Sequence, residues 1–181
     1  MMILMSPRER ERTPAPSAQV GSLRLDDQLC FALYAASRSV TQLYRHVLAE
    51  LGLTYPQYLV MLVLWEREEV MIGELTTLLA LDYGTLSPLL KRLQAAGLLA
   101  RRRRTDDERV VAITLTRAGA QLKTRATAIP QLIVDAYGLS ATDFGALRDR
   151  LVRLTEAVAT AQALAPAVLP SVRATKRRSR S

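Results

Sequence analysis

The sequence has very few of the side chains that most catalytic and metal sites require. Its 181 residues include one cysteine, Cys30, and one histidine, His46. A single cysteine excludes an internal disulfide, and one cysteine with one histidine is too small a set for a structural zinc site. A Ser-His-Asp triad would have to use His46, which lies on a predicted, mostly solvated helix, and we assign it no role. We therefore expect neither a metal nor another cofactor.

Aromatic residues and long apolar runs are also scarce. Aromatic residues account for 5% of the chain and hydrophobic residues for 49%, so the core must consist mostly of leucine, valine and alanine, which favours helices. The longest apolar run, residues 59–65, is far shorter than the roughly 18 residues that span a membrane. The N-terminal stretch MMILMSPRERER has charge after its apolar part and no cleavage-like site, unlike a secretory signal. With a lone free thiol, these features predict a cytoplasmic protein without membrane contact.

The net charge of the chain is +8 at pH 7, and most of it lies near the C-terminus. Residues 173–181 contribute five of these charges and residues 1–22 contribute one, which leaves two for residues 23–172. Overall basicity is thus weak evidence for nucleic-acid binding, because a basic tail also serves solubility. Inside the body, the basic residues cluster at 91–92, 101–104 and 109, and such a local cluster is better evidence for a nucleic-acid contact.

One folded domain, residues 23–165, between two tails is the organisation that the sequence predicts. Residues 1–22, where prolines interrupt alternating charges, are predicted to be a disordered extension, and residues 166–181 a disordered basic tail. Hydrophobic periodicity predicts helices at about 25–51, 55–67, 72–79, 83–96, 116–137 and 141–164. Two β-prone runs at 98–103 and 110–115, with a polar turn between them, predict one hairpin.

Polar residues and prolines indicate where these helices begin and where they are interrupted. The expected capping residues are Asp26 or Asp27, Thr54, Asp82, Thr116 and Ser140, each just before the helix that it starts. Pro88 predicts either a bend in its helix or a later start near Thr85. Pro130 predicts a kink in the helix at 116–137.

A short helix, a turn, a second helix and then a hairpin is the order of a winged helix-turn-helix. The predicted fold class is therefore mainly α, with about six helices and a β-hairpin wing. The DNA-binding lobe is expected at about 55–116, between dimerisation helices at about 25–51 and 117–164. The leucines of the recognition helix, 83–96, are expected to face inward, which leaves outside Tyr83, Thr85, Ser87, Pro88, Lys91 and Arg92. In the wing we expect Arg104 and Arg109 to reach DNA, with Asp107 supporting the turn; Arg109 has the alternative role of pairing with Asp107 to hold that turn.

The last predicted helix carries a narrow apolar stripe. Steps of three and four residues connect Phe144, Leu147, Leu151, Leu154, Val158 and Ala161. Such a heptad-like seam is typical of packing against another helix. The partner is either the first helix of the same chain or, as we prefer, a second copy across a two-fold axis.

The helix-turn-helix and wing segments resemble the MarR-type winged-helix family. The matching segments are LDYGTLSPLLKRL at 81–93, Gly97-Leu98, Asp107-Glu108-Arg109 and Leu115-Thr116. Two further segments, LCFALY at 29–34 and LTYPQYLVMLVLWE at 53–66, are more closely similar to its organic hydroperoxide resistance regulators, of the type that has one cysteine. The resemblance implies a homodimeric repressor that binds a pseudo-palindromic operator and releases it when an organic hydroperoxide oxidises the cysteine. Tyr83 departs from the small residue expected in the turn.

Cys30 can be interpreted in two ways from the residues alone. A cysteine on the apolar face of a helix is commonly an inert core thiol. Cys30 also lies within about a turn of a helix start, where exposed N–H groups favour the thiolate that attacks a peroxide O–O bond. Tyr34 lies four residues on, on the same face, whereas Asp26 and Asp27 disfavour a nearby thiolate.

The resemblance favours the sensing interpretation and extends the site. In the hydroperoxide regulators two tyrosines of the partner subunit donate hydrogen bonds to the reactive sulfur, and the matching positions here are Tyr44 and Tyr55. Leu29, Phe31 and Trp65 are expected to supply apolar surroundings that favour organic peroxides. Because there is no second cysteine, we expect the oxidised sulfur to form a mixed disulfide with a low-molecular-weight thiol.

Two other functions remain open from the sequence. The first is a MarR-type repressor that a small phenolic ligand releases, with Cys30 inert. The second is an enzyme, a thiol peroxidase, although the chain lacks a thioredoxin-type βαβ pattern. A Cys30→Ser variant that still responds to a ligand would select the first, and catalytic consumption of peroxide would select the second. Our prediction is a regulator and not an enzyme.

Overall fold

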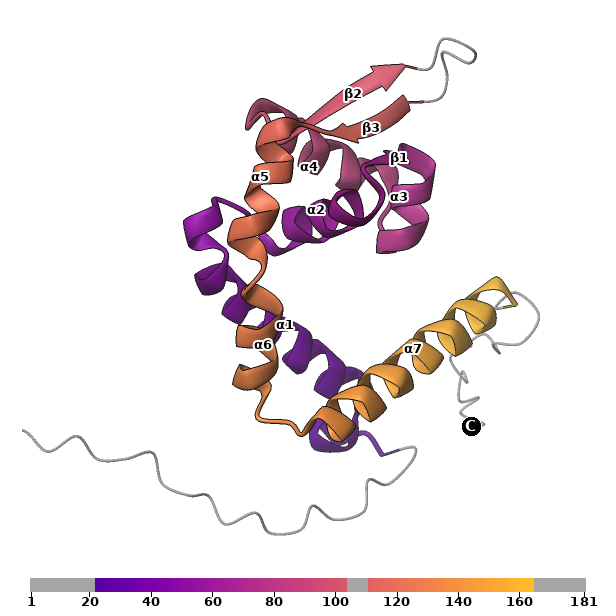
Figure 1. Ribbon diagram of the computed structural model, residues 1–181. Helices are drawn as coiled ribbons and strands as arrows, with labels where there is room; N and C mark the ends of the chain where they lie inside the picture. The colour runs from indigo at the N-terminus through magenta and orange to yellow at the C-terminus, as the bar shows by residue number, and fades with distance from the viewer. Residues whose placement is uncertain (1–21, 104–110, 165–181) are drawn as a thin grey trace, which may run out of the picture. The chain divides into compact units, whose positions relative to one another are not determined.

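The structure is a computed structural model that describes residues 22–103 and 111–164 (Figure 1). Residues 1–21 of the predicted N-terminal extension, the basic tail and the wing residues Arg104, Asp107 and Arg109 lie outside the described residues. The helices are α1 (Leu29–Val47), α2 (Tyr55–Arg67), α3 (Ile72–Leu79), α4 (Tyr83–Ala95), α5 (Arg117–Ala126), α6 (Ile129–Tyr137) and α7 (Ala141–Ala163). The strands are β1 (Glu69–Met71), β2 (Leu99–Arg103) and β3 (Val111–Leu115). Among the described helices, none is long and apolar enough to cross a membrane.

The chain divides into two compact units between Thr127 and Ala128. The first unit holds α1 to α5 and the sheet, and the second holds α6 and α7. The core of the first unit is built around α2, which buries Tyr58, Met61, Leu64 and Trp65. Gln57 sets the start of this helix, because its side-chain oxygen accepts hydrogen bonds from the backbone N–H (2.8 Å) and the hydroxyl (3.0 Å) of Thr54.

The helix-turn-helix forms as predicted. α3 ends at Leu79, and the left-handed backbone of the next residue, Ala80 (φ 50°), turns the chain toward α4. Asp82 caps α4, which begins at Tyr83 and continues past Pro88 to Ala95, so the later start near Thr85 is wrong. The inward face of this helix carries the predicted leucines, all of them buried: Leu86, Leu89, Leu90 and Leu93. The helix-turn-helix is therefore fixed by apolar packing on one side only.

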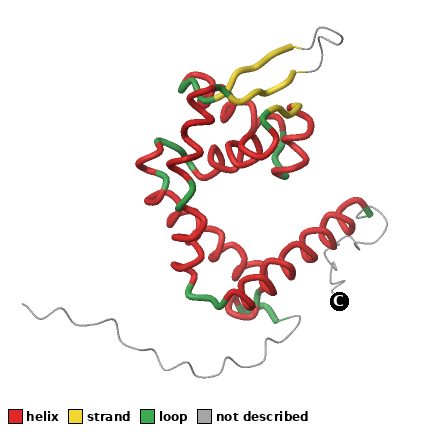
Figure 2. The backbone as a smooth tube through the Cα atoms, viewed as in Figure 1, coloured by secondary structure: helices red, strands yellow, loops and turns green. Residues whose placement is uncertain are grey.

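The predicted hairpin is confirmed and is part of a larger sheet. β2 and β3 pair antiparallel from Leu99 opposite Leu115 to Arg103 opposite Val111. A third strand that the sequence analysis missed, β1, pairs antiparallel with β3 and places the sheet order at β1-β3-β2 (Figure 2). The sequence did not indicate β1 because three residues are too few to show the alternating pattern of a strand. Its central residue, Val70, is buried.

Two predicted helices differ from the structure. The first begins at Leu29 instead of Leu25, because residues 25–27 form a separate 3₁₀ turn and the extended Gln28 (φ −87°, ψ 114°) interrupts the helix. Gln28 is the capping position and makes no side-chain cap, so the expectation that Asp26 or Asp27 caps this helix is wrong. The predicted helix at 116–137 is two helices, α5 and α6, because Pro130 lies in the first turn of α6, where no backbone N–H is needed.

Gly119 at the start of α5 lies against the chain that enters β2. A Cβ atom at this position would lie 2.1 Å from the carbonyl oxygen of Leu98 and 2.8 Å from Cδ1 of Leu115. The Gly119 carbonyl accepts a hydrogen bond from Trp65 Nε1 at 2.9 Å, and its N–H donates to Thr116 Oγ1 at 3.0 Å. Thr116 Oγ1 in turn donates to the carbonyl of Gly97 at 2.6 Å. The base of the wing, α2 and α5 therefore meet at this glycine.

We predict that Gly119→Ala lowers the free energy of unfolding by about 1–3 kcal/mol, since the added methyl group overlaps backbone that cannot easily move. Gly73→Ala in α3 is the control, because a Cβ there has no neighbour within 4 Å. The control should be neutral or stabilise the protein by up to about 1 kcal/mol. Urea unfolding of the three proteins measures both values, and equal stability of Gly119→Ala and the wild type would show that this close approach does not constrain the fold.

Candidate nucleic-acid interface and thiol site

The outward face of α4 is polar and basic. Tyr83, Thr85, Pro88, Lys91 and Arg92 are exposed, as predicted for the recognition helix, and Ser87 is half-buried. The opposite face is the buried leucine face, so the helical period separates one side that packs from one side that is free to meet a ligand. Two adjacent cations on such a face, at Lys91 and Arg92, suit contacts to phosphate oxygens.

The first turn of α4 is held by a carboxylate. Asp82 Oδ1 accepts a hydrogen bond from the backbone N–H of Thr85 at 2.8 Å, and Asp82 Oδ2 accepts one from the Thr85 hydroxyl at 2.7 Å. These two bonds, the hydroxyl bond first, hold the pKa of Asp82 below its ordinary value. The carboxylate is therefore ionised at neutral pH, and the side chain of Thr85 has a defined orientation.

Arg101 connects the wing to α4. Its side chain comes from β2 and its Nη2 donates a hydrogen bond to the carbonyl of Ser87 at 3.0 Å. Its Nε is buried and has no hydrogen-bond partner among the described residues. Arg102, the next residue along the strand, is exposed. In the sequence the arginines 101–104 form one basic cluster. The two-residue alternation of the strand divides its first two members into Arg101, which faces inward and positions the wing, and Arg102, which faces outward and is exposed.

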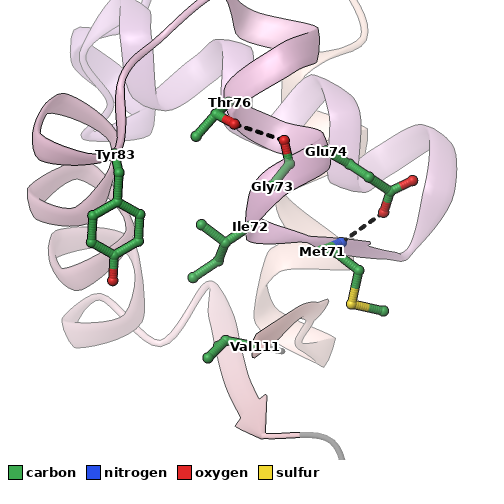
Figure 3. Close-up of a pocket in the computed structure, with 7 residues that line it drawn as sticks. All are labelled: Met71, Ile72, Gly73, Glu74, Thr76, Tyr83 and Val111. Carbon is green, nitrogen blue, oxygen red and sulfur yellow. Dashed lines mark hydrogen bonds between the residues drawn. The ribbon is translucent and has the colours of Figure 1, made fainter. Parts of the chain in front are cut away.

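A hollow of about 620 Å³ lies beside the start of the recognition helix. Figure 3 shows Tyr83 of α4 on one side of it and Ile72 at the start of α3 facing the tyrosine ring. Val111 of β3 and Met71 contribute to the same lining. Glu74 is engaged by the backbone N–H of Met71 at 2.9 Å, so its carboxylate caps α3. Tyr83, which departs from the small residue expected here, thus forms one wall of this hollow and is 60% exposed.

The thiol lies at the start of α1. Cys30 is the second residue of that helix and its side chain is exposed. Its apolar neighbours Leu29 and Phe31 are exposed as well, at 62% and 37%. Tyr34, one turn on, accepts a hydrogen bond at its hydroxyl oxygen from Arg38 Nη1 at 3.2 Å, and the guanidinium lies 5.6 Å from the ring centroid. An exposed cysteine is accessible to a peroxide, and the exposed apolar residues around it are available for a partner surface.

Four aromatic side chains, Tyr55, Tyr44, Tyr58 and Trp65, form a continuous row inside the first unit. The ring centroids are 4.4 Å apart for Tyr55 and Tyr44, 5.8 Å for Tyr44 and Tyr58, and 6.0 Å for Tyr58 and Trp65. Burial, with a smaller effect of Tyr55, raises the pKa of Tyr58, which keeps its hydroxyl protonated. Trp65 is buried within its own subunit, and its place beside a peroxide stays a prediction. The aromatic row reaches Gly119 through the Trp65 indole N–H.

Cys30 and Tyr44 lie on the same straight element but far apart. Both belong to α1, and fourteen residues separate them in the numbering. At about 1.5 Å per residue their backbones are about 21 Å apart along the helix axis, which is too far for a hydrogen bond. If Tyr44 and its neighbour Tyr55 donate to a reactive sulfur, that sulfur belongs to a second copy of the chain.

The second unit carries the predicted apolar stripe on α7. Leu147, Leu151 and Val158 are exposed, at 47%, 39% and 47%, and Leu154 is half-buried. Phe144, at the start of the stripe, stacks on Tyr137 of α6 with ring centroids 6.2 Å apart. Ser140 caps the helix as predicted and accepts a hydrogen bond from the Asp143 N–H at 3.1 Å. Three large aliphatic residues of one stripe are therefore left exposed to solvent in the single chain.

Comparison with known proteins identifies the family. Residues 42–125 match the family described as transcriptional regulator SarA/Rot. The chain is 45% identical over 134 residues to the organic hydroperoxide resistance transcriptional regulator of Bacillus subtilis, which covers 74% of this chain and 91% of that protein. The structure of reduced AbfR bound to DNA is 33% identical with a TM-score of 0.63, over 75% of this chain and 94% of that one. AbfR comes from Staphylococcus epidermidis.

A more distant structure shows the same fold. A MarR variant of E. coli in complex with operator DNA is 23% identical and has a TM-score of 0.64, over 70% of this chain and 92% of that one. The relatives with higher identity are regulators of transcription. The chain therefore belongs to the MarR-type family of winged-helix transcriptional regulators, and not to a family of enzymes.

Proposed function

We propose that this protein is a cytoplasmic, homodimeric repressor that binds a pseudo-palindromic operator and releases it when an organic hydroperoxide oxidises Cys30. The observation that carries the proposal is the position of the thiol: the only cysteine is exposed in the first turn of α1, in a chain that is 45% identical to an organic hydroperoxide resistance regulator. An inert core thiol would be buried.

DNA binding is assigned to α4 and the wing. α4 presents Lys91 and Arg92 on its exposed face, and Arg101 holds the wing strand against the same helix. Two such lobes in a homodimer would enter successive major grooves when their recognition helices lie about 34–36 Å apart. The relatives support this assignment, since AbfR, at 33% identity, has been crystallised with DNA. The predicted contacts of Arg104 and Arg109, with Asp107 as support, complete the interface in this proposal.

The proposed sensing reaction consumes one organic hydroperoxide and one low-molecular-weight thiol for each Cys30. The Cys30 thiolate attacks one oxygen of the hydroperoxide, an S–O bond forms, the O–O bond breaks, and the alcohol leaves after taking up a proton. The product is a sulfenic acid. A low-molecular-weight thiol then attacks the sulfur, a mixed disulfide forms and water leaves. In this proposal Tyr44 and Tyr55 of the second subunit donate hydrogen bonds to the sulfur before oxidation, and the adduct displaces them.

A bulky adduct, more than added oxygen alone, is the releasing species in this proposal. AbfR has been crystallised on DNA both reduced and overoxidised, at 33% and 34% identity to this chain. In that relative, the overoxidised form is therefore compatible with the DNA-bound state. The mixed disulfide at Cys30 adds a whole molecule at a surface that the exposed Leu29 and Phe31 indicate to be an interface. Displacing one subunit from the other would change the separation of the two recognition helices.

We predict that Lys91→Ala weakens operator binding and flattens the slope of log affinity against log salt by about one, since one phosphate contact is lost. Gln94→Ala, on the same helix and also exposed, is the uncharged control and should leave the slope unchanged. Fluorescence anisotropy over a salt series measures both slopes. An unchanged slope for Lys91→Ala would remove this lysine from the phosphate contacts.

We predict that the wild-type protein releases DNA when an organic hydroperoxide and a low-molecular-weight thiol are added together, whereas Cys30→Ser remains bound. Intact-mass measurement should show one thiol adduct per wild-type chain and none on the variant, because the chain has a single cysteine. Release of the variant by peroxide would exclude Cys30 as the sensor. Release of the variant by a phenolic compound alone would instead favour the ligand-responsive alternative.

We predict that Leu151→Glu shifts the protein from dimer to monomer, because it places a charge in the exposed apolar stripe of α7. Arg153→Glu changes charge on the other side of the same helix and should leave the dimer intact. Sedimentation velocity separates the two states. If Leu151→Glu remains a dimer with unchanged affinity, the stripe is not part of the dimer interface.

A further inference from the structure

The hydroxyl hydrogen of Thr85 is already engaged before any DNA arrives. Thr85 is exposed on the outward face of α4, where the recognition helix begins. Its Oγ1 donates to Asp82 Oδ2 at 2.7 Å, while its backbone N–H donates to Asp82 Oδ1 at 2.8 Å. The two bonds act together, because the N-cap bond fixes the carboxylate and the carboxylate then fixes the hydroxyl.

The partner of this hydroxyl can only accept. An ionised carboxylate has no proton to give, so the shared hydrogen must come from Thr85. The low pKa of Asp82, caused mainly by the Thr85 hydroxyl and then by its N–H, keeps the carboxylate ionised at neutral pH. Gly84 lies between the two residues, and a Cβ there would lie 3.0 Å from Asp82 Oδ1. Glycine at position 84 therefore avoids a close contact with the Asp82 carboxylate.

Because its hydrogen is bonded to Asp82, the Thr85 hydroxyl can accept a hydrogen bond from DNA but cannot donate one. A free hydroxyl can donate to guanine or thymine oxygens and can accept from adenine or cytosine amines in the major groove. With the hydrogen directed to Asp82, the lone pairs of Oγ1 and the methyl group remain. The lone pairs match the adenine N6 and cytosine N4 amines, and they repel the guanine O6 and N7 and thymine O4 acceptors.

We propose that Asp82 is a positioning residue for base recognition, which makes Thr85 a pure acceptor that selects an adenine or cytosine amine in each half of the operator. The inference rests on the proposed DNA-binding function and refines it. Asp82 itself does not touch the base. It acts through the direction of one hydroxyl hydrogen.

The test compares three variants of the full-length, reduced protein on DNA chosen by the wild type. Selection from a randomised duplex library yields a consensus, and affinities are then measured for that duplex and for each single base-pair change. In Thr85→Val the hydroxyl is replaced by a methyl group of similar size. We expect this variant to lose about three- to tenfold of discrimination at one position per half-site, since one hydrogen bond is lost, and to keep the other positions.

Asp82→Asn is the decisive variant. Asparagine caps helices as well as aspartate does, so its carbonyl oxygen keeps the bond from the Thr85 N–H. Its amide NH₂ then lies where Oδ2 was and donates to Thr85 Oγ1, which releases the hydroxyl hydrogen. We expect the preferred base at the Thr85 position to change from adenine or cytosine to guanine or thymine, by about three- to tenfold, with other positions unchanged. Thr85→Ser, which keeps the hydroxyl, should keep the wild-type preference.

Each result of this experiment bears on the inference. If Asp82→Asn binds with the wild-type order of bases at every position, Asp82 is only a helix cap and the inference is wrong. A uniform loss of affinity with an unchanged order has the same meaning, and circular dichroism melting reports any loss of structure alongside it. If Thr85→Val keeps every preference, Thr85 does not read a base and the inference is also wrong. If the wild type enriches no sequence at all, the proposed DNA-binding function fails first and the inference fails with it.

Discussion

The buried leucine face of α4 is the constraint on which the rest of the molecule depends. Leu86, Leu90 and Leu93 are fully enclosed, and burying a leucine side chain contributes roughly 1.5–3 kcal/mol. Because all the packing lies on one side, the other side of the helix is free to carry tyrosine, threonine and cations without affecting the core. The wing adds a second support through the Arg101 bond to the Ser87 carbonyl. A rigid helix with a free outer face is what recognition of a groove requires.

The same body has a physical connection from the proposed sensor to the wing. Tyr44 and Tyr55 lie at one end of the aromatic row, and Trp65 at the other end donates to the carbonyl of Gly119. Gly119 lies directly against Leu98, the residue that leads into β2. Lys123 adds a bond to the Trp65 carbonyl at 2.8 Å, so α5 holds the row at two points. The row and these bonds therefore form one continuous set of contacts between the two predicted thiol-supporting tyrosines and the base of the wing.

Much of this fold follows from local signals in the sequence, and the exceptions have physical causes. The starts of α4, α5 and α7 were predictable because Asp82, Thr116 and Ser140 are capping residues whose side chains accept the expected bonds from backbone N–H groups. The start of α2 was predictable from the pair Thr54 and Gln57, where the Gln57 side chain accepts a bond from the Thr54 backbone N–H. The start of α1 was not, because two candidate aspartates precede a glutamine that caps without its side chain. The break between α5 and α6 depends on whether Pro130 bends a helix or begins one, and the sequence pattern is the same for both. β1 forms only because β3 offers it an edge.

The DNA-binding face of α4 and the thiol site at Cys30 were predictable from the sequence to different degrees. The exposed face of α4 follows from helical periodicity, and the structure places all six predicted side chains there, with Ser87 partly covered. The position of Cys30 near the start of a helix also follows from the sequence, whereas hydrogen bonds to its sulfur from Tyr44 and Tyr55 of a second copy stay a prediction. The different roles of Arg101 and Arg102 required the strand register, which composition cannot supply.

The free-energy change that the proposed DNA release needs is consistent with a modification at one cysteine per chain. To move a dimer from almost fully DNA-bound to almost fully DNA-free, oxidation must change the free energy of DNA binding by about 5.5 kcal/mol. A homodimer has two thiols, so each adduct needs to contribute about half of that. In the proposed mechanism the sulfur loses the hydrogen bonds from Tyr44 and Tyr55, and a hydrogen bond to a charged group is worth about 1.5–3 kcal/mol, which is of this order. A single cysteine per chain is therefore sufficient, provided that its hydrogen-bond donors come from the other subunit and the cost of separation falls on the interface between the two DNA-binding lobes.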